Sequence, residues 1–339
     1  MIVLSLVFTV LVACGGAEPE APAEPEAPAV EEDTPEPDAD EETPEPEEVE
    51  APEAEEELYL ISFSAGFSMV QHWELSMNGA QRAADENGAE FFFAFADGDL
   101  ARQVADIETM VEMGIDMLIV GPANSEAIVP TLQALPIPFL TADIGADMDV
   151  VAHVASDNFH IGVMAAEFLG EELGGEGRVA ILGWTAAFAT LEREQGFIQT
   201  MEEQFPDIEI IVHQDVGGDR SRALETGENI LQANADLDAI FGSNAEIAMG
   251  AYAATMAANR TEVIVISVDT DPEVMTAIES GTNLIATIAQ DPFQIGYNAM
   301  LTAIRYLRGE PVSDVIIPAE VVTIANVQEI IDRDNANLR

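Results

Sequence analysis

The sequence contains no lysine, and its eleven basic residues, all arginine, are opposed by 64 acidic residues, which gives a formal net charge of −53. Charge of that sign repels nucleic acid phosphates and anionic lipid headgroups, so we expect neither as a direct partner. Self-repulsion also disfavours a compact state unless salt screens it. A saline habitat and a lineage-wide bias toward acidic, lysine-poor proteins both account for this charge.

Cysteine is nearly absent as well, since Cys14 is the only one, and an intrachain disulfide is therefore impossible. The sequence also lacks the P-loop, Gly-x-Ser-x-Gly and His-Glu-x-x-His motifs, and its four histidines are scattered without a metal-binding spacing. These absences predict a protein that is not an enzyme and that holds neither a cofactor nor a metal ion.

The first 14 residues end in Leu11-Val12-Ala13-Cys14, a short apolar run closed by small residues and a cysteine. This pattern is typical of a bacterial lipoprotein signal, although no basic residue precedes the run. Residues 1–13 are too short to span a bilayer, which takes about 20 apolar residues. We expect residues 1–13 to be a signal peptide and Cys14 to carry a lipid that holds the mature protein outside the cytoplasm. The alternative is a cysteine that only happens to end an apolar segment.

Residues 17–57 consist mainly of Glu, Pro, Ala and Asp, with 20 acidic residues and no basic one. Such a segment buries too little surface to offset the entropy of ordering, and proline and like charge keep it extended. About 40 residues reach on the order of 100 Å. We therefore predict a disordered tether over residues 14–57, with an acidic tail for a basic partner as the alternative. The rest of the chain keeps 44 acidic residues against 11 arginines, an excess of 33 negative charges.

From residue 58 onward, short β-rich runs alternate with amphipathic helical stretches. This alternation predicts an α/β fold with parallel sheets and right-handed crossovers, and so many strands fit two doubly wound lobes better than one sheet. The predicted strands are 58–64, 90–95, 117–120, 139–141, 179–182, 208–212, 239–241, 263–268 and 285–288. The predicted helices lie near 72–87, 100–113, 125–135, 159–173, 191–204, 220–232, 246–258, 272–280 and 292–307.

Several short stretches match one family in their order and spacing: Asn78–Gln81, Ile137–Asp143, Val154–Asn158, Arg193–Phe197, Ala239–Glu246, Val268–Asp269 and Ile285–Pro292. Together they make residues 58–327 resemble the type I periplasmic sugar-binding proteins, the ribose-binding group in particular. The resemblance implies two Rossmann-like lobes joined by a three-strand hinge.

The resemblance also implies how the chain divides between the lobes. We expect residues 58–157 plus 291–318 to form the first lobe and residues 158–290 plus 319–339 to form the second. The hinge crossings should lie near Ala155–Asn158, at Gln290–Pro292 and around Ile317–Glu320.

Polar residues follow directly on four predicted strands, and ligands of open α/β sheets bind beyond the carboxyl ends of the strands. Sugar hydroxyls both donate and accept, which suits carboxylates, amides and the arginine fork, whereas the C–H faces of a sugar need aromatic surface. In the resemblance, two adjacent ring-bearing residues after the first strand supply that surface. The candidate ligand-binding residues are His72, Trp73, Asp143, Arg193, Asn244, Asp269 and Gln290.

Simpler roles are open for three of these residues. Asn244 alone could be a helix N-cap, Asp269 a turn residue, and Arg193 a member of a surface ion pair. Asp143 and Asp269 would face each other across the cleft, and paired carboxylates are also the arrangement of glycosidases. In the resembled family they act as hydrogen-bond acceptors, so we rank hydrolysis below binding.

The sequence departs from the ribose-binding pattern at three places. Ile144 stands where the family has an arginine, Gly218 where it has an aromatic residue, and Val70-Gln71 where it has an asparagine before the ring pair. A sugar or polyol larger than a pentose, or of another shape, is therefore expected. Trp184 and Phe188 are candidates for the missing aromatic wall, with core or lid packing as the preferred alternative.

The resemblance implies a monomeric, extracytoplasmic solute-binding protein that captures a sugar or polyol and delivers it to the permease of an ABC transporter. A receptor that feeds a sensor kinase or a chemotaxis system is the alternative. A transcriptional regulator on the same fold would need a basic helix-turn-helix before the lobes, where this chain has an apolar run and an acidic segment.

Overall fold

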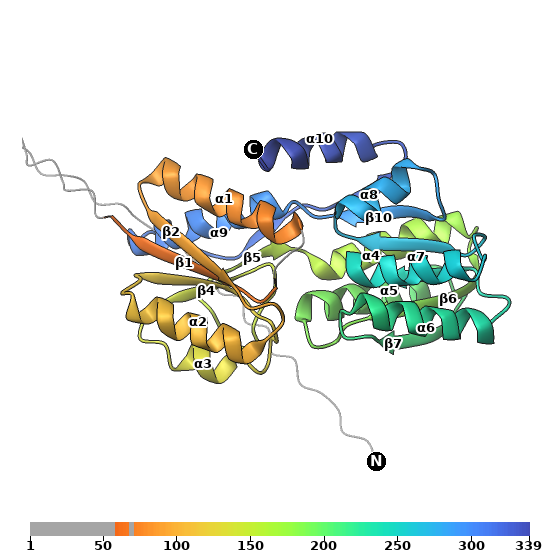
Figure 1. The fold of residues 1–339 in the computed structure, drawn as a ribbon, viewed down its shortest axis with the longest axis horizontal. Coiled ribbons are helices and arrows are strands. Elements are labelled where there is room, and N and C mark those ends of the chain that lie inside the picture. The colour runs from red at the N-terminus through yellow and green to blue at the C-terminus, as the bar shows by residue number, and fades with distance from the viewer. Residues whose placement is uncertain (1–57, 68–70) are drawn as a thin grey trace, which may run out of the picture. The chain divides into compact units, whose positions relative to one another are not determined.

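The computed structural model describes residues 58–67 and 71–339, so the expected signal peptide, Cys14 and tether lie outside the described residues. The described chain alternates strands and helices as the sequence predicts (Figure 1). In chain order the elements are β1 (Leu60–Ala65), α1 (Gln71–Asn87), β2 (Glu90–Phe95), α2 (Leu100–Glu112), β3 (Met117–Gly121), α3 (Val129–Gln133), β4 (Phe139–Ala142), β5 (His153–Ser156), α4 (Asn158–Glu172), β6 (Glu176–Gly183), α5 (Phe188–Gln204), β7 (Asp207–Asp215), α6 (Arg220–Ala233), β8 (Ala239–Gly242), α7 (Ala245–Ala257), β9 (Ile264–Val268), α8 (Pro272–Glu279), β10 (Leu284–Ala289), α9 (Pro292–Leu307), β11 (Val315–Ile317), β12 (Glu320–Thr323) and α10 (Val327–Asn337).

The strands form two six-stranded sheets, in the orders β11-β5-β4-β3-β1-β2 and β12-β10-β9-β8-β6-β7. Every neighbouring pair is parallel except β10 with β12, which is antiparallel. The two orders are equivalent when read along the chain, so each lobe repeats one doubly wound topology. The predicted fold class of two Rossmann-like lobes is thus confirmed (Figure 1).

Three connections join the lobes, which confirms the three-strand hinge. β5 belongs to the first sheet, whereas α4, which follows it, packs on α5 of the second lobe. After β10 the chain returns to α9, which packs on α1, and β11 of the first sheet leads directly to β12 of the second. The strands β5, β11 and β12 were not predicted, because three or four residues are too few to show a periodicity. The eleven-residue helix α10 was not predicted either.

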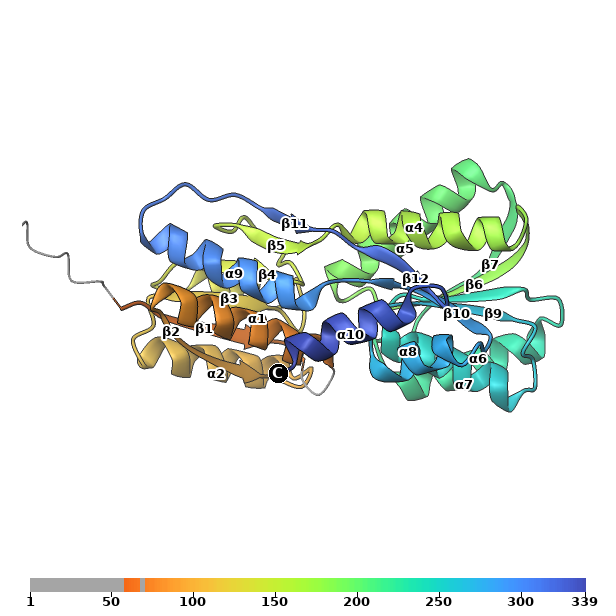
Figure 2. The same cartoon turned by 90° about the horizontal axis from the view of Figure 1, so that it is seen from above.

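Helix α10 lies against both lobes. It packs on α8 and β12 of the second lobe, and its end reaches α1 of the first, where Asn78 Nδ2 donates a hydrogen bond to the carbonyl oxygen of Asn337 at 3.2 Å (Figure 2). The assignment of residues 319–339 to the second lobe therefore stays a prediction.

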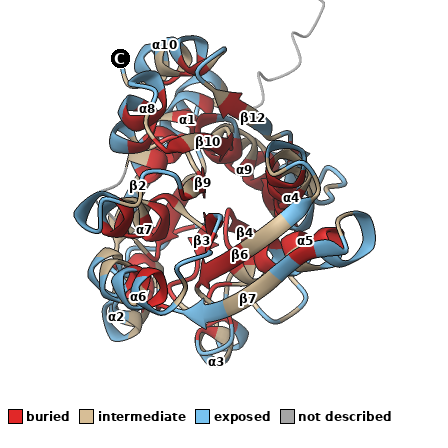
Figure 3. Cartoon of the chain, turned by 90° about the vertical axis from the view of Figure 1, so that its right-hand side faces the viewer, coloured by how far each residue is buried: buried red, intermediate tan, exposed pale blue. Residues whose placement is uncertain are grey.

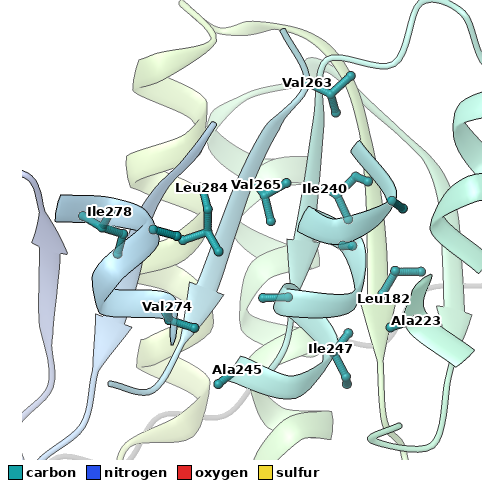
Figure 4. Packing of buried hydrophobic residues seen from close by; sticks show 14 of the residues in the cluster. Leu182, Ala223, Ile240, Ala245, Ile247, Val263, Val265, Val274, Ile278 and Leu284 are labelled. Carbon is teal, nitrogen blue, oxygen red and sulfur yellow. The ribbon is translucent and has the colours of Figure 1, made fainter. Parts of the chain in front are cut away.

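The core of each lobe lies on both faces of its sheet, as the continuous apolar runs of the central strands require. In Figure 3, β6 is largely buried, whereas β7 at the sheet edge is mostly intermediate or exposed. Figure 4 shows Leu182, Ile240 and Val265 on neighbouring strands of the second sheet, packed against Ile247 of α7 and Val274 of α8. This packing holds the carboxyl ends of the strands in fixed positions.

Glycines set the closest helix contact in each lobe. A Cβ added at Gly79 of α1 or Gly296 of α9 would lie 2.0 Å or 1.8 Å from a carbonyl oxygen of the facing helix. In the second lobe, a Cβ at Gly162 of α4 or Gly196 of α5 would lie 2.0 Å from such an oxygen. Helices α1 and α5 also carry candidate ligand residues, so these glycine contacts position the site.

Candidate ligand site

A cavity of about 470 Å³ lies between the two lobes, at the carboxyl ends of both sheets. Residues of both lobes line it, and all seven residues predicted from the sequence are among them. The lining residues are Phe67, His72, Trp73, Asp143, Ile144, Trp184, Ala187, Ala189, Thr190, Arg193, Gly217, Gly218, Asn244, Ala245, Glu246, Asp269, Asp271 and Gln290.

Two aspartates occupy equivalent positions in the two lobes. Asp143 follows β4 and Asp269 follows β9, and both have left-handed backbones, with φ of 65° and 81°. Non-glycine residues adopt this conformation rarely, although aspartate tolerates it better than most. Strained backbone tends to cluster at ligand sites because the surrounding structure must maintain it. The turns therefore hold both carboxylates at the cavity, which fits a ligand role for Asp269 as well as the simpler turn role.

His72 of α1 lies between these two carboxylates. Its Nε2 atom is 2.9 Å from Oδ1 of Asp143, and its Nδ1 atom is 3.9 Å from Oδ1 of Asp269 in the other lobe. Burial alone would lower the pKa of His72, but the attraction of Asp143, its hydrogen bond and the attraction of Asp269 raise the pKa to about 9 despite the opposing charge of Arg193. At neutral pH the imidazole is therefore a buried cation that links the lobes.

Arg193 is 3% exposed, so the reading of a surface ion pair is wrong. Its Nε donates to Oδ1 of Asn158 at 2.8 Å, and its Nη1 donates to the carbonyl oxygen of Ser243 at 3.0 Å. The same Nη1 lies 3.9 Å from Oδ2 of Asp269. These contacts fix the plane of the guanidinium, which has five N–H groups and keeps donor capacity for a ligand.

In each of the two amide side chains, Asn244 and Gln290, one polar atom is held by a hydrogen bond within the protein. Asn244 Oδ1 accepts from the backbone N–H of Ile247 at 2.9 Å and so caps α7, as the simpler role proposed. Gln290 Nε2 donates to Oδ1 of Asp269 at 2.7 Å, and the buried Oε1 of Gln290 has no partner among the described residues. An unpaired buried acceptor is costly, so a ligand hydroxyl donating to Gln290 would stabilise the site.

Of the two candidates for the missing aromatic wall, Trp184 lines the cavity and Phe188 does not. Trp73 is 4% exposed and packs edge-on against Phe63, so the core holds most of its ring. Trp184 lines the cavity and meets Phe67 in a T-shaped contact with ring centroids 5.1 Å apart. A Cβ at Gly218 would lie 3.1 Å from the Trp184 ring, so Trp184 occupies the space an aromatic residue there would need.

Phe188 lines a separate cavity of about 590 Å³ beside β5 and β11, and is not among the residues of the candidate site. The stacking role of His72 and Trp73 was expected only from the resemblance and stays a prediction. Nothing in the sequence pointed to Phe67, which lies two residues after β1 and immediately before residues outside the described part of the chain.

Two acidic residues at the cavity were missed as well. Asp271 occupies the N-cap position directly before α8, but its side chain does not cap the helix. Burial, together with the neighbouring Asp269 carboxylate, raises the pKa of Asp271 to about 7. Glu246 is held by Arg220, whose Nε and Nη2 atoms each donate to a different carboxylate oxygen at 2.9 Å. In the sequence, Asp271 marked only a helix start, and Glu246 was part of the matching stretch Ala239–Glu246 without being named as a ligand residue.

The cavity therefore presents more acceptors than donors, with two buried cations at its centre. Burial alone would raise the pKa of the Asp143 carboxyl, but the adjacent His72 cation holds that pKa below its usual range. A glycosidase needs one carboxyl with a raised pKa as its general acid, a role to which Asp143 is unsuited, whereas the Asp271 carboxyl does have a raised pKa. The surplus of acceptors also fits the binding of a molecule with several hydroxyl groups.

We expect the His72 cation to make stability depend on pH. Its pKa is raised from 6.5 to about 9 on folding, so its stabilisation is complete below pH 6.5 and is lost as the pH rises through 9. The free energy of unfolding, measured by urea titration, should favour wild type over His72→Gln most at pH 6.5, and the difference should shrink by pH 10. His160→Gln, at an exposed histidine of α4, is the control and should show no such trend. An equal difference at every pH would contradict the assignment.

Over residues 58–67 and 71–339, no group of three His, Cys, Asp or Glu side chains is placed to hold a metal ion. No helix in this part of the chain is long and apolar enough to cross a membrane.

Comparison with known proteins agrees with this architecture. A family model described as a periplasmic binding protein domain matches residues 61–311. The ribose import binding protein of Haemophilus influenzae is 35% identical over 253 residues, which cover 73% of this chain and 85% of that protein. An ABC transporter solute-binding protein from Bacillus halodurans, solved with bound myo-inositol, has a TM-score of 0.76 at 27% identity, over 83% of this chain and 100% of that one. A periplasmic solute-binding protein from Actinobacillus succinogenes, solved with bound D-allose, has a TM-score of 0.73 at 25% identity, over 80% and 99% of the two chains. With the family model spanning most of both lobes, this chain belongs to the type I periplasmic binding proteins.

Proposed function

We propose that the chain captures a sugar or polyol in the cavity between its lobes and delivers it to the permease of an ABC importer. The observation that carries the proposal is the buried set of charged groups around this cavity, where Arg193 and His72 lie within reach of Asp269 from different elements. Carboxylates, a guanidinium and amides converging on one cavity are the groups that recognise hydroxyls. The hinge between the lobes allows closure over the ligand.

The comparisons support the same class of ligand. The family consists of binding proteins that work outside the cytoplasm. The relatives described above bind ribose, myo-inositol and D-allose by name or in their solved structures. One is an import protein by name and the other two are solute-binding proteins of ABC transporters, which favours transport over a role in sensing. Ile144 removes an arginine from the first-lobe wall and Trp184 replaces an aromatic residue at position 218, so a ligand other than ribose in its usual pose is proposed.

A thermal-shift screen tests the proposal. The panel is D-ribose, D-allose, D-glucose, D-galactose, xylitol and myo-inositol, each at millimolar concentration. A ligand at 100 times its Kd stabilises the folded state by about 2.7 kcal/mol, which is readily seen as a rise in the melting temperature. The same sugars against Arg193→Ala should give a much smaller rise. If no sugar or polyol raises the melting temperature of the wild type, the proposed ligand class is wrong.

We propose further that Cys14 is lipidated and that residues 14–57 tether the lobes to the membrane. The support is the apolar run that ends at Cys14 and the acidic, proline-rich segment after it. Metabolic labelling with a fatty-acid analogue in a bacterial host should tag the wild type, and Cys14→Ser should lose the label. Equal labelling of the two forms would contradict the anchor.

We also propose that the protein is a monomer and that its two lobes divide near residues 157, 290 and 318.

A further inference from the structure

A second cavity, of about 770 Å³, adjoins the candidate ligand site. The two share Glu246 and Asp271, which line both. Its first-lobe wall comes from α1 and β2, where Phe93 and Phe95 line it, and its second-lobe wall comes from α6 and α8. It is therefore part of the same interlobe cleft, on the side toward β2 and α8.

The aromatic wall of this second cavity is unusual. Strand β2 lies at the edge of its sheet, and Phe91, Phe93 and Phe95 occupy alternate positions and hence one face. Their rings form a continuous row, with centroids 5.7 Å and 5.3 Å apart. Phe93 is 45% exposed. Phe91 and Phe95 are half-buried. An exposed phenylalanine on an edge strand invites aggregation, so the presence of Phe93 at the mouth of a ligand cleft favours a binding role.

Polar groups lie opposite the aromatic row. Among the described residues, the Asp271 carboxylate has no hydrogen-bond partner, although it stands at the junction of the two cavities. Glu246 beside it is fixed by Arg220, which also pairs with Glu273 at 2.6 Å. A sugar ring presents an apolar C–H face and a polar edge of hydroxyl groups. The aromatic wall of the cavity is complementary to the C–H face, and the fixed carboxylates and arginine opposite it are complementary to the hydroxyl edge.

We propose that this second cavity is a second sugar subsite, so that the ligand is a disaccharide or another glycoside. One ring lies among Asp143, Arg193 and Asp269, and the second ring stacks on Phe93 and Phe95 while its hydroxyls reach the junction carboxylates. The inference rests on the proposed function, because it requires a sugar in the first cavity. It goes beyond that function by naming a two-ring ligand.

Calorimetric titration of the full chain with lactose, melibiose and cellobiose, and with D-glucose and D-galactose, tests the subsite. At least one disaccharide should bind ten or more times as tightly as either of its constituent monosaccharides. Phe93→Ala should weaken that disaccharide roughly 5–10-fold, the loss of one stacking contact, and change monosaccharide binding less than twofold. Phe93 is exposed enough that its truncation should leave the fold intact, and circular dichroism checks this.

Two further variants separate the possible results. Tyr306→Ala removes an aromatic ring of α9 that is 38% exposed and lines neither cavity, and it should leave the binding of every sugar unchanged. Arg193→Ala should weaken disaccharides and monosaccharides alike. If monosaccharides bind as tightly as disaccharides, or if Phe93→Ala leaves disaccharide binding intact or weakens both classes equally, the subsite is wrong and the proposed function stands. If neither class binds, both proposals fail.

Discussion

Replacing Arg193 with alanine or Asp269 with asparagine should lower the affinity for the bound sugar roughly 10- to 150-fold. Both side chains are charged and largely buried at the cavity, and removing one partner of a charged, buried hydrogen bond costs about 1.5–3 kcal/mol. Asp269→Asn is the sharper change, because it keeps the side-chain volume and removes only the charge and one acceptor. It also disturbs Gln290, which donates to the Asp269 carboxylate.

Calorimetric titration of the sugar found by the thermal-shift screen, into wild type and both variants, measures this loss. Arg178→Ala is a matched control, because Arg178 is an ion-paired arginine near the start of β6, at the opposite end of the strand from the cavity. It should bind the sugar within twofold of wild type. If Asp269→Asn and Arg193→Ala also bind within twofold while circular dichroism shows them folded, these residues are not ligand contacts.

Much of the site could be predicted because parallel strands place their carboxyl ends at one edge of a sheet. Asp143, Asp269 and Gln290 directly follow their strands, so strand prediction alone brought them to the cleft. Arg193 could be predicted to lie on a helix, but the burial of its side chain could not be predicted. That burial depends on contacts with Asn158 and Ser243, which are distant in the sequence.

The sequence named Trp184 as a candidate for the missing aromatic wall but preferred core or lid packing, and the choice could not be made for the same physical reason. Trp184 fills the space beside Gly218 only because the loops after β6 and β7 approach each other, and no local pattern encodes that approach. Similarly, Asp271 directly precedes Pro272, the first residue of α8, and this position in the sequence marks only a helix start. Its place between two cavities depends on how α8 lies relative to α1 and β2 of the first lobe, which are distant in the sequence.

The short strands at the hinge could not be predicted from hydrophobic periodicity. β11 has three residues and β12 has four, and each is held in place by pairing with a longer-range neighbour, β5 or β10. The resemblance supplied the crossing near Ile317–Glu320, whereas the hydrophobic pattern did not. The close contacts between helices at glycine residues could not be predicted either, because a glycine within a helical pattern indicates close packing only once the facing helix is known.

Those glycine contacts lead to the largest expected effect on stability. In the first lobe, α1 and α9 cross so closely that an added Cβ at Gly296 would lie 1.8 Å from the carbonyl oxygen of Ser76. That oxygen belongs to the helix backbone and cannot rotate away as a flexible side chain could, so the two helices must separate. The separation would also disturb the layer beneath them, because α9 packs on β3, β4 and β5.

Gly296→Ala should therefore destabilise the protein by about 3 kcal/mol, the upper part of the range for overpacking, even though alanine favours a helix over glycine by up to ~1 kcal/mol. The melting temperature, measured by calorimetry, should fall by roughly 5–10 °C.

Gly145→Ala is the control, because a Cβ there would meet only the His153 ring at 3.7 Å, which is an ordinary contact. The melting temperature of Gly145→Ala should stay within about 2 °C of wild type. Since α1 carries His72 and Trp73, Gly296→Ala should also weaken sugar binding. An unchanged melting temperature for Gly296→Ala would show that α1 and α9 are not in backbone contact, and the helix that positions the first-lobe side of the site would then have to be placed differently.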